Sequence, residues 1–380
     1  MTVFPMVPLG SVAIITNNRA NPFTLSSTTP HIGLEHMKRG GGLESISTIG
    51  SLGIKSTVGT FETGSVLFGR LRPNLRKVAR VDFSGTCSGD INSLITSEAL
   101  SADYLAHFLR SDIAAAQIQR FVTGINLPRI NAKSLKKIQV PLPPLDEQRR
   151  IADILDSSKD LHNRTIRHAS LASTLTSVIP EPIDPAEVSL SHYVSSVSSG
   201  RNVSEVDNNI SGARVLKVSA VTSQYFRPEE SKLLPDSYLP PSQHRVMSGD
   251  LIVSRANTKD LVGAAALVQS EVNNMYLPDK LWRLNLKDHV DRHFLWCLLG
   301  NPAIRSRIGQ RASGSSGSMK NISQKNFLSL PVPNFSRPEQ QEIGARVRAS
   351  LEYTEALEKK SEKLDELYNS LATRAFAGEL

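Results

Sequence analysis

The chain has 380 residues, with 44 Lys and Arg against 36 Asp and Glu and a net charge of +8. Its length exceeds that of one ordinary domain, and 39% hydrophobic with 21% charged residues exclude an intrinsically disordered chain. Two cysteines, Cys87 and Cys297, can form neither a disulfide framework nor a four-thiolate zinc site. No apolar window reaches the length of a membrane span and the N-terminus does not read as a secretory signal, so we expect a folded cytoplasmic protein.

Short apolar runs and helical spacing predict the same order of elements twice along the chain. Each half is predicted to contain buried strands, a helix, a proline-rich strand that cannot lie at a sheet centre, and a long terminal helix. The predicted strands and helices are, in chain order, strands 31–34 and 66–68, helix 102–119, strand 140–144, strands 215–218 and 251–253, helix 292–308 and strand 330–333.

Three alignments show an internal repeat. Residues 130–148 align without a gap with 322–340 at an offset of 192. Residues 64–70 resemble 249–255 at an offset of 185, and apolar residues of 104–109 match those of 294–299 at an offset of 190. We therefore predict that one unit of about 190 residues is used twice.

The two proline-rich segments are followed by helix start signals. Asp146 and Glu147 place acidic residues in a first turn, and Ser336–Glu339 reads as a capping box. Residues at heptad positions in both helices then predict that the two long helices pack against each other as an antiparallel pair. Each helix has a row of such residues, its seam, that can face the other helix. The predicted seam residues are Ile154, Leu161, His168 and Leu175, flanked by Ile151, Ser158, Thr165 and Ala172, in the first helix, and Ile343, Ser350, Leu357, Leu364 and Leu371 in the second.

The basic excess lies in only two of the four segments that these boundaries define. Residues 1–144 and 180–335 carry net charges of +7 and +3, whereas 145–179 and 336–380 carry 0 and −2. This pattern suits two modules that face nucleic acid, separated by segments that face protein. A mildly basic surface without such a role explains the charge alone equally well.

Several motifs together resemble the specificity subunit of type I restriction-modification enzymes. They are PLPPLDEQRRIADILD, its degenerate copy VPNFSRPEQQEIGARV, the C-terminal LDELYNSLATRAFAGEL, HIGLEHM, RVLKVSAV, LFGRLRPNLRKVARV with CSGDI, LPDKLWRL and SGSSGSMKNISQKNF. Each is weak alone, but their order and repetition span nearly the whole chain. Ser336-Arg337 departs from the first copy, which has Pro144-Leu145 at that place.

The resemblance implies an α/β fold with two mixed α/β target recognition domains joined by two long helices in an antiparallel coiled coil with a pseudo-twofold repeat. The expected divisions are recognition domains at 1–144 and 180–335, a central spacer helix at 145–179 and a C-terminal spacer helix at 336–380. It further implies a non-catalytic subunit that reads one half of a bipartite double-stranded DNA site with each domain. S-adenosylmethionine would bind to two methyltransferase partners, and ATP and Mg would bind to motor-nuclease partners where these exist.

Cations that follow a buried strand into a turn are the strongest candidates for DNA contact, since Arg and Asn read bases and Lys meets phosphate. The expected DNA-binding residues are Lys55, Arg70, Arg72, Asn74, Arg76, Lys77, Lys133, Lys136, Lys137, Lys217, Arg255, Asn257, Lys259, Lys320 and Lys325. Arg149, Arg150 and Glu355, on outward helix faces, are expected to dock the methyltransferase subunits.

No catalytic or metal-binding residues are predicted. The Gly50–Ser56 segment has the wrong spacing for a phosphate loop, no glycine-rich S-adenosylmethionine loop follows a first strand, and the nine histidines lack ligand spacing. Two alternatives stay open: a methyltransferase or metal-dependent nuclease that acts alone, and a helical scaffold that binds only protein.

Overall fold

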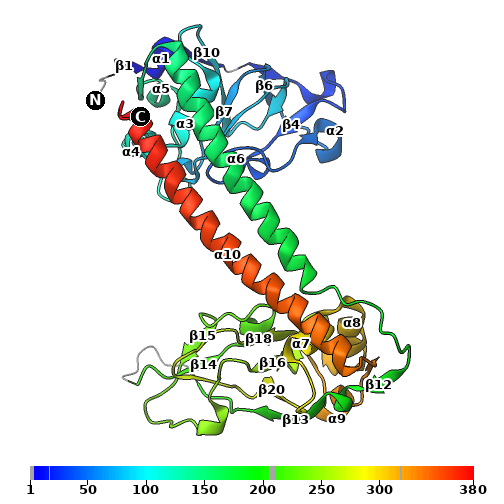
Figure 1. Ribbon diagram of the computed structural model, residues 1–380. Helices are drawn as coiled ribbons and strands as arrows, with labels where there is room; N and C mark the ends of the chain where they lie inside the picture. The colour runs from blue at the N-terminus through cyan, green and yellow to red at the C-terminus, as the bar shows by residue number, and fades with distance from the viewer. Residues whose placement is uncertain (1–3, 17, 205–210, 317–318) are drawn as a thin grey trace. The chain divides into compact units, whose positions relative to one another are not determined.

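The computed structural model describes residues 4–16, 18–204, 211–316 and 319–380. It divides into two compact units, one of residues 1–166 with 359–380 and one of residues 167–358. Each unit contains a mixed α/β module together with parts of two long helices, α6 (Leu145–Leu175) and α10 (Arg337–Phe376), which are the green and red helices of Figure 1.

The module of unit 1 contains two larger sheets and the two-stranded sheet β1-β11. A four-stranded antiparallel sheet has the order β2-β10-β7-β8, and a five-stranded sheet has the order β3-β6-β9-β4-β5. Helix α3 packs against β7 and β8 of the four-stranded sheet, and α4 packs against α3 and β11. The strands are β1 (Met6–Pro8), β2 (Ala13–Thr16), β3 (Arg19–Ala20), β4 (Pro30–Ile32), β5 (Ser47–Thr48), β6 (Val58–Phe61), β7 (Val66–Gly69), β8 (Val78–Arg80), β9 (Gly85–Cys87), β10 (Ile91–Thr96) and β11 (Gln139–Pro141). The helices are α1 (Leu9–Val12), α2 (Ile49–Leu52), α3 (Ala102–Arg110), α4 (Asp112–Gln119) and α5 (Ala132–Leu135), with 3-10 turns η1 (Pro22–Thr24), η2 (Leu34–His36) and η3 (Pro73–Leu75).

The module of unit 2 repeats the four-stranded sheet, in the order β13-β20-β16-β18. Two three-stranded sheets, β15-β14-β19 and β17-β22-β21, and the two-stranded sheet β12-β23 also belong to it. The strands are β12 (Glu187–Ser189), β13 (Val194–Ser199), β14 (Arg214–Leu216), β15 (Ser231–Leu233), β16 (Leu251–Ser254), β17 (Ala256–Asn257), β18 (Ala265–Leu267), β19 (Met275–Tyr276), β20 (Leu281–Leu286), β21 (Ser313–Ser316), β22 (Met319–Asn321) and β23 (Pro331–Pro333). The helices are α7 (Arg292–Gly300), α8 (Pro302–Arg311) and α9 (Gln324–Leu328), with 3-10 turns η4 (Leu190–His192), η5 (Val218–Val221) and η6 (Ser242–His244).

Strand register confirms the repeat predicted from the sequence. In unit 1, Asn92 lies opposite Phe68. In unit 2, Trp282 lies opposite Val253, and these are the residues at the predicted offsets of 190 and 185. The proline-rich strands β11 and β23 each lie in a two-stranded sheet, paired with β1 and β12, where a residue without an N–H is tolerated.

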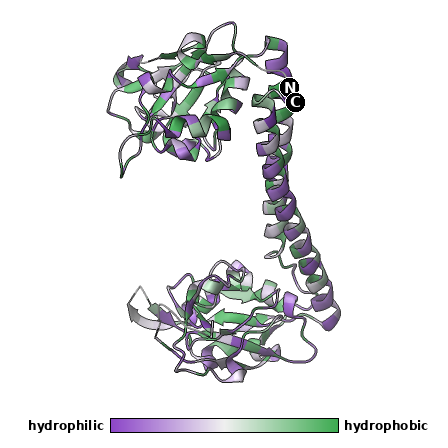
Figure 2. Ribbon diagram, turned by 90° about the vertical axis from the view of Figure 1, so that its left-hand side faces the viewer, coloured by the Kyte–Doolittle hydropathy of each residue, from purple (hydrophilic) through white to green (hydrophobic). Residues whose placement is uncertain are grey.

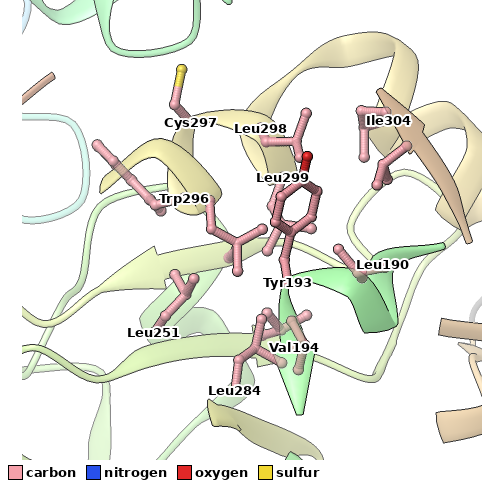
Figure 3. Packing of buried hydrophobic residues seen from close by; sticks show 14 of the residues in the cluster. Leu190, Tyr193, Val194, Leu251, Leu284, Trp296, Cys297, Leu298, Leu299 and Ile304 are labelled. Carbon is pink, nitrogen blue, oxygen red and sulfur yellow. The ribbon is translucent and has the colours of Figure 1, made fainter. Parts of the chain in front are cut away.

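Apolar residues fill the space between sheet and helices in each module. In unit 2, Figure 3 shows Leu190 and Tyr193 facing Leu298 and Leu299 of α7, with Leu284 of β20 beneath them. Figure 2 shows the hydrophobic colour gathered on the strands and short helices of each module, whereas α6 and α10 are mainly hydrophilic. Burial of this kind supplies the main favourable term in folding.

A tyrosine hydroxyl donates to the equivalent proline carbonyl in both modules, but from different elements. Tyr104 of α3 donates to Pro141 O at 2.9 Å, and Tyr193, just after η4, donates to Pro333 O at 3.0 Å. Pro141 and Pro333 are equivalent at the offset of 192. In each module, the backbone carbonyl of the equivalent proline therefore accepts a hydrogen bond from a tyrosine hydroxyl. This accords with the cost of leaving a buried carbonyl without a hydrogen-bond partner.

The long helices run antiparallel within each unit. In unit 1, His162 Nδ1 donates to Ser361 O at 3.0 Å, while Arg150, nearer the start of α6, contacts Leu380 at the chain end. In unit 2, Ser350 of α10 donates to Ala172 O at 2.6 Å.

The predicted seam of α6 was partly wrong. Leu161 and Leu175 are 43% and 50% exposed, whereas the buried seam is the flanking row of smaller residues, among them Ser158, Thr165 and Ala172. The hydroxyls of Thr165 and of Ser350 in α10 donate to the backbone carbonyls of Leu161 and Ala172, so that small polar side chains fit in the seam.

The predicted seam of α10 was confirmed. Its residues Ile343, Ser350, Leu357 and Leu364 are buried, and Leu371 is half-buried.

A buried histidine joins α3 to both long helices in unit 1. His107 Nε2 lies 2.9 Å from Asp156 of α6, and its Nδ1 lies 2.9 Å from the Tyr368 hydroxyl of α10. Burial lowers the pKa of His107, so the ring is neutral near pH 7. Because a carboxylate only accepts, Nε2 carries the proton and Nδ1 accepts from Tyr368.

A buried lysine lies near this histidine. Burial lowers the pKa of Lys159 to about 7. Its ammonium group donates to Gly40 O and Gly41 O.

A glutamine repeated in the sequence motif fastens the start of each long helix. Gln148 is fully buried, accepts from Ser101 N at 2.8 Å, and donates to Ala99 O and Pro143 O. Its counterpart Gln340 donates to Phe335 O at 2.8 Å, but its Oε1 has no partner among the described residues.

Replacing these glutamines should therefore have unequal effects. We predict that Gln148→Leu lowers the free energy of unfolding by roughly 1–3 kcal/mol, because buried backbone groups at three positions lose their partner. Gln340→Leu, the matched control, should cost clearly less, since it removes fewer hydrogen bonds. Urea denaturation followed by circular dichroism measures both, and equal losses would contradict the structural difference.

No helix in the described part of the chain combines the length and the apolar content that a bilayer crossing requires.

Candidate nucleic-acid interface

In unit 1 the end of β7 leads into a segment that a hairpin holds in place. Residues 123–129 form the hairpin, in which Thr123 and Arg129 exchange backbone hydrogen bonds at 2.9 and 2.8 Å. Arg72 N donates to Pro128 O at 2.7 Å, and Ile130 N donates to Arg70 O at 3.1 Å. The backbone from Arg70 to Arg72 is thus fixed before any ligand binds, which reduces the entropic cost of contact.

Unit 2 contains the same arrangement. Ile322 N donates to Arg255 O at 3.0 Å, and β17 pairs with β22 so that Asn257 lies opposite Lys320. The structure therefore brings together Arg255, Asn257 and Lys320, although Lys320 is distant in the sequence. At the repeat offset of 185, Arg255 corresponds to Arg70 and Asn257 to Arg72. The two modules therefore carry the same residue at the first position and different polar residues at the second, on equivalent stretches of backbone.

The predicted cations of unit 1 fall into two groups. Arg72 and Asn74 are exposed, and Arg72 adopts a left-handed conformation with φ of 49°, which is uncommon for a residue with a side chain. Arg76 and Lys77 have protein partners instead: Arg76 donates to Asp112 at 2.5 Å and Lys77 to Leu34 O at 2.6 Å. Arg72 and Asn74 are thus the freer groups for contact with DNA.

In unit 2 two of the predicted cations are likewise engaged with backbone carbonyls. Arg255 Nε donates to Asp279 O at 2.9 Å, and Lys320 donates to Gly314 O at 2.6 Å. Asn257 is half-buried and Lys259 is exposed in the turn that follows β17. These contacts hold the side chains in position but leave donors of both cations for a further partner.

The remaining predicted lysines are exposed, and DNA contact stays a prediction for them. They lie in or just after the short helices α5 and α9, after α2, and before η5, namely Lys133, Lys136, Lys137, Lys325, Lys55 and Lys217. Asn131 and Ser323 cap the N-termini of α5 and α9 in the same way, which explains why the motif repeats there.

Sequence reasoning missed Arg129. It forms a bridge with Leu71 and an ion pair with Asp90 at 3.3 Å, so it lies against the Arg70–Arg72 segment. Its counterpart Asn321 lies opposite Ala256 in unit 2. Extending the alignment of the repeat to the residues just before Ile130 and Ile322 would have pointed to this position.

The predicted docking residues lie on exposed faces of the long helices. Arg149 and Arg150 form ion pairs one turn back, with Asp146 at 3.3 Å and Glu147 at 2.7 Å. The hydrogen bond from Arg150 lowers the pKa of Glu147. Glu355 is also exposed. Exposed apolar side chains accompany them: Leu161, Ile166 and Leu367 in unit 1, and Leu171, Leu175 and Tyr353 in unit 2.

Comparison with known proteins relates this architecture to one family. Residues 7–169 match the family described as "Type I restriction modification DNA specificity domain". The chain is 26% identical over 303 residues to the EcoKI specificity subunit of Escherichia coli strain K12, which covers 73% of this chain and 65% of that relative. It is 35% identical over 119 residues to the EcoEI specificity subunit of Escherichia coli, covering 31% of this chain and 20% of that one.

A solved structure shows the same fold. It comes from work on complex assembly and conformational transition of the type I R-M system, with a TM-score of 0.62, 18% identity, and coverage of 99% of this chain and 98% of that chain. The match to the EcoKI subunit spans just under two thirds of that relative's length.

Charge reversal at Arg72 tests the interface in unit 1. We predict that Arg72→Glu weakens binding of duplex DNA by roughly tenfold or more, because an exposed cation on a fixed backbone is replaced by a group that repels phosphate. Arg164→Glu, a reversal at an exposed position of α6, is the control and should change affinity far less. Fluorescence anisotropy at several salt concentrations measures both; equal effects would remove the special role of Arg72.

Proposed function

We propose that this chain, which belongs to the family of type I restriction-modification specificity subunits, reads a bipartite DNA site and does no chemistry itself. Each module would contact one half-site through its hairpin-supported segment, Arg70–Arg72 in unit 1 and Arg255–Asn257 in unit 2. One observation carries this proposal. Equivalent backbone hydrogen bonds hold this segment in both modules, but the side chains on it differ.

The differing side chains suit different half-sites. Arginine pairs in bidentate fashion with the acceptors of guanine, whereas asparagine pairs with adenine. Arg72 in unit 1 and Asn257 in unit 2 occupy equivalent positions, so the two modules would prefer different bases there. The lysines around them would contact phosphate, which positions the protein but carries no sequence information.

The long helices would serve as spacer and docking surface for two methyltransferase subunits. Their exposed apolar residues, such as Leu161 and Leu175, and the ion-paired residues Arg149 and Arg150 offer a mixed surface of the kind found at protein interfaces. S-adenosylmethionine would bind to those partners, and ATP and Mg would bind to motor-nuclease subunits where the system has them.

Reconstitution distinguishes this proposal from the alternatives. The purified chain with S-adenosylmethionine or Mg²⁺ should neither methylate nor cut DNA, whereas co-expression with its methyltransferase partner should yield methylated adenines at a bipartite site. Single-molecule sequencing of the host DNA reads the modification. Methyl transfer or cleavage by the chain alone would instead favour a stand-alone enzyme, and failure to bind any duplex even with the partner present would favour a protein scaffold.

The spacer role predicts a change of target when both helices are lengthened at matched sites. His162 contacts Ser361 within unit 1, and Ser350 contacts Ala172 within unit 2. Positions after Ile166 in α6 and after Ala356 in α10 lie between these two contacts along both helices, so they are suitable insertion sites. Seven residues keep the heptad seam and add about 10.5 Å, or about three base pairs.

We predict that the double insertion lengthens the unread spacer by about three base pairs and leaves both half-sites unchanged. Inserting the seven residues in α6 alone is the control, and it should abolish methylation because the seam loses its partner. Methylome sequencing gives the target of each variant. An active double variant with its original spacer would refute the spacer role of the helices.

A further inference from the structure

The hairpin beside the candidate interface of unit 1 carries an apolar side chain that the protein leaves uncovered. Ile125 lies in the bend of this hairpin, between Gly124 and Asn126, and is 99% exposed. Among the described residues no other large apolar side chain is as exposed. Leu127, at the end of the same bend, is 52% exposed. Single exposed apolar residues are common on protein surfaces, so exposure alone assigns no role to Ile125.

The backbone around Ile125 is held in place from both sides. Two backbone hydrogen bonds close the hairpin at its base, and a third joins Pro128 O to Arg72 N. Gly124 has a φ of 94°, and a Cβ atom there would lie 2.9 Å from Leu127 O. The bend therefore requires glycine at this position. Because the bend is this tight, Ile125 is presented at the tip of a short and supported hairpin.

Ile125 lies close to the arginine that we propose to read bases. Pro128, which is bonded to Arg72, is only three residues further along the chain. Three residues span at most about 11 Å, the length of about three base-pair steps of roughly 3.4 Å. Arg72 is exposed, and the hairpin contains no Asp or Glu that would repel phosphate. A duplex in contact with Arg72 would therefore be within reach of Ile125.

The equivalent hairpin of unit 2 carries different side chains. Strands β21 and β22 form it. Met319 takes the place of Leu127 at the offset of 192 and is 44% exposed. The four residues before Met319 read Ser-Ser-Gly-Ser in the sequence, so unit 2 has no counterpart of Ile125. The apolar tip therefore belongs to unit 1 and is not a consequence of the shared fold.

We propose that Ile125 contacts the 5-methyl group of a thymine in the half-site that unit 1 reads, and so contributes to the choice of bases there. The inference rests on the proposed function. The thymine methyl is the apolar group that base edges present in the major groove, where Arg72 can also pair with guanine. Insertion of Ile125 between stacked bases would require their unstacking, whereas the methyl group is reached without deforming the duplex.

A double-mutant cycle between Ile125→Ala and a missing methyl group tests this directly. Each thymine in the half-site whose protection depends on Arg72 is replaced in turn by deoxyuridine, which lacks only the methyl group. Fluorescence anisotropy gives the affinity of the full-length chain with its methyltransferase partner. We expect Ile125→Ala and one deoxyuridine substitution each to weaken binding roughly fourfold, the effect of returning one apolar group to water. Combined, the two changes should weaken binding no further than either alone.

Ile183→Ala is the matched control. Ile183 is 86% exposed and precedes β12 in unit 2, outside the candidate interface. This substitution should change the affinity by less than about twofold, as expected of a surface position without a partner on the DNA. Ile125→Val keeps a branched apolar side chain and should retain most of the affinity. Because the Ile125 side chain is exposed, neither of its variants loses buried contacts, and both should fold.

Three results would contradict the proposal. If Ile125→Ala binds the target as well as Ile183→Ala does, the hairpin tip does not contact DNA, and the inference fails while the proposed function stands. If Ile125→Ala binds more weakly but no deoxyuridine substitution matters, or the two effects multiply, Ile125 contacts another part of the DNA and the thymine assignment is wrong. Absence of DNA binding by the unchanged chain, with its methyltransferase partner present, would overturn the proposed function and this inference together.

Discussion

The fastening of each long helix to its module is the constraint on which the rest of the structure depends. A proline-rich strand reaches the edge of the module, a tyrosine hydroxyl holds its carbonyl, and a buried glutamine ties the following helix start to the same segment. Buried hydrogen bonds of this kind are costly to leave unmade. A helix held in this way cannot pivot freely at its first turn, so the module and the first turns of the helix that follows it behave as one body.

Both modules hold their long helix and the segment after the strand in the same way. The side chains of the candidate interface can therefore differ between the modules without changing the backbone that carries them. The strand that ends at Arg70 or Arg255 and the segment beside it are held by backbone hydrogen bonds, which do not depend on the identity of the side chains. Side chains at equivalent positions can then differ, as Arg72 and Asn257 do.

Much of the fold could be predicted from the sequence because several of its segments occur twice, so that each copy supported the prediction made for the other. The strand at 66–68, the proline-rich edge strands and the two long helices were confirmed. The seam of α6 was partly wrong, because heptad spacing alone favoured Leu161 and Leu175 over the smaller Ser158 and Thr165. Small residues fit the seam in part because hydroxyls such as that of Thr165 find carbonyl partners, and this depends on contacts that no single-helix pattern reveals.

The candidate site was less predictable. A run of cations after a strand does not indicate which of them find partners in the protein, and Arg76 and Lys77 do so only because α4 and η2 lie beside them in the fold. Arg129 was missed because its role depends on a bridge to Leu71.

The central claim is that one DNA-reading framework is used twice, and hydroxyl-radical footprinting on the methylated target tests it most directly. The account predicts two separate protected segments on the duplex, one lost in Arg72→Glu and the other in Asn257→Asp. A single protected segment, or two segments that both disappear with either substitution alone, would contradict it.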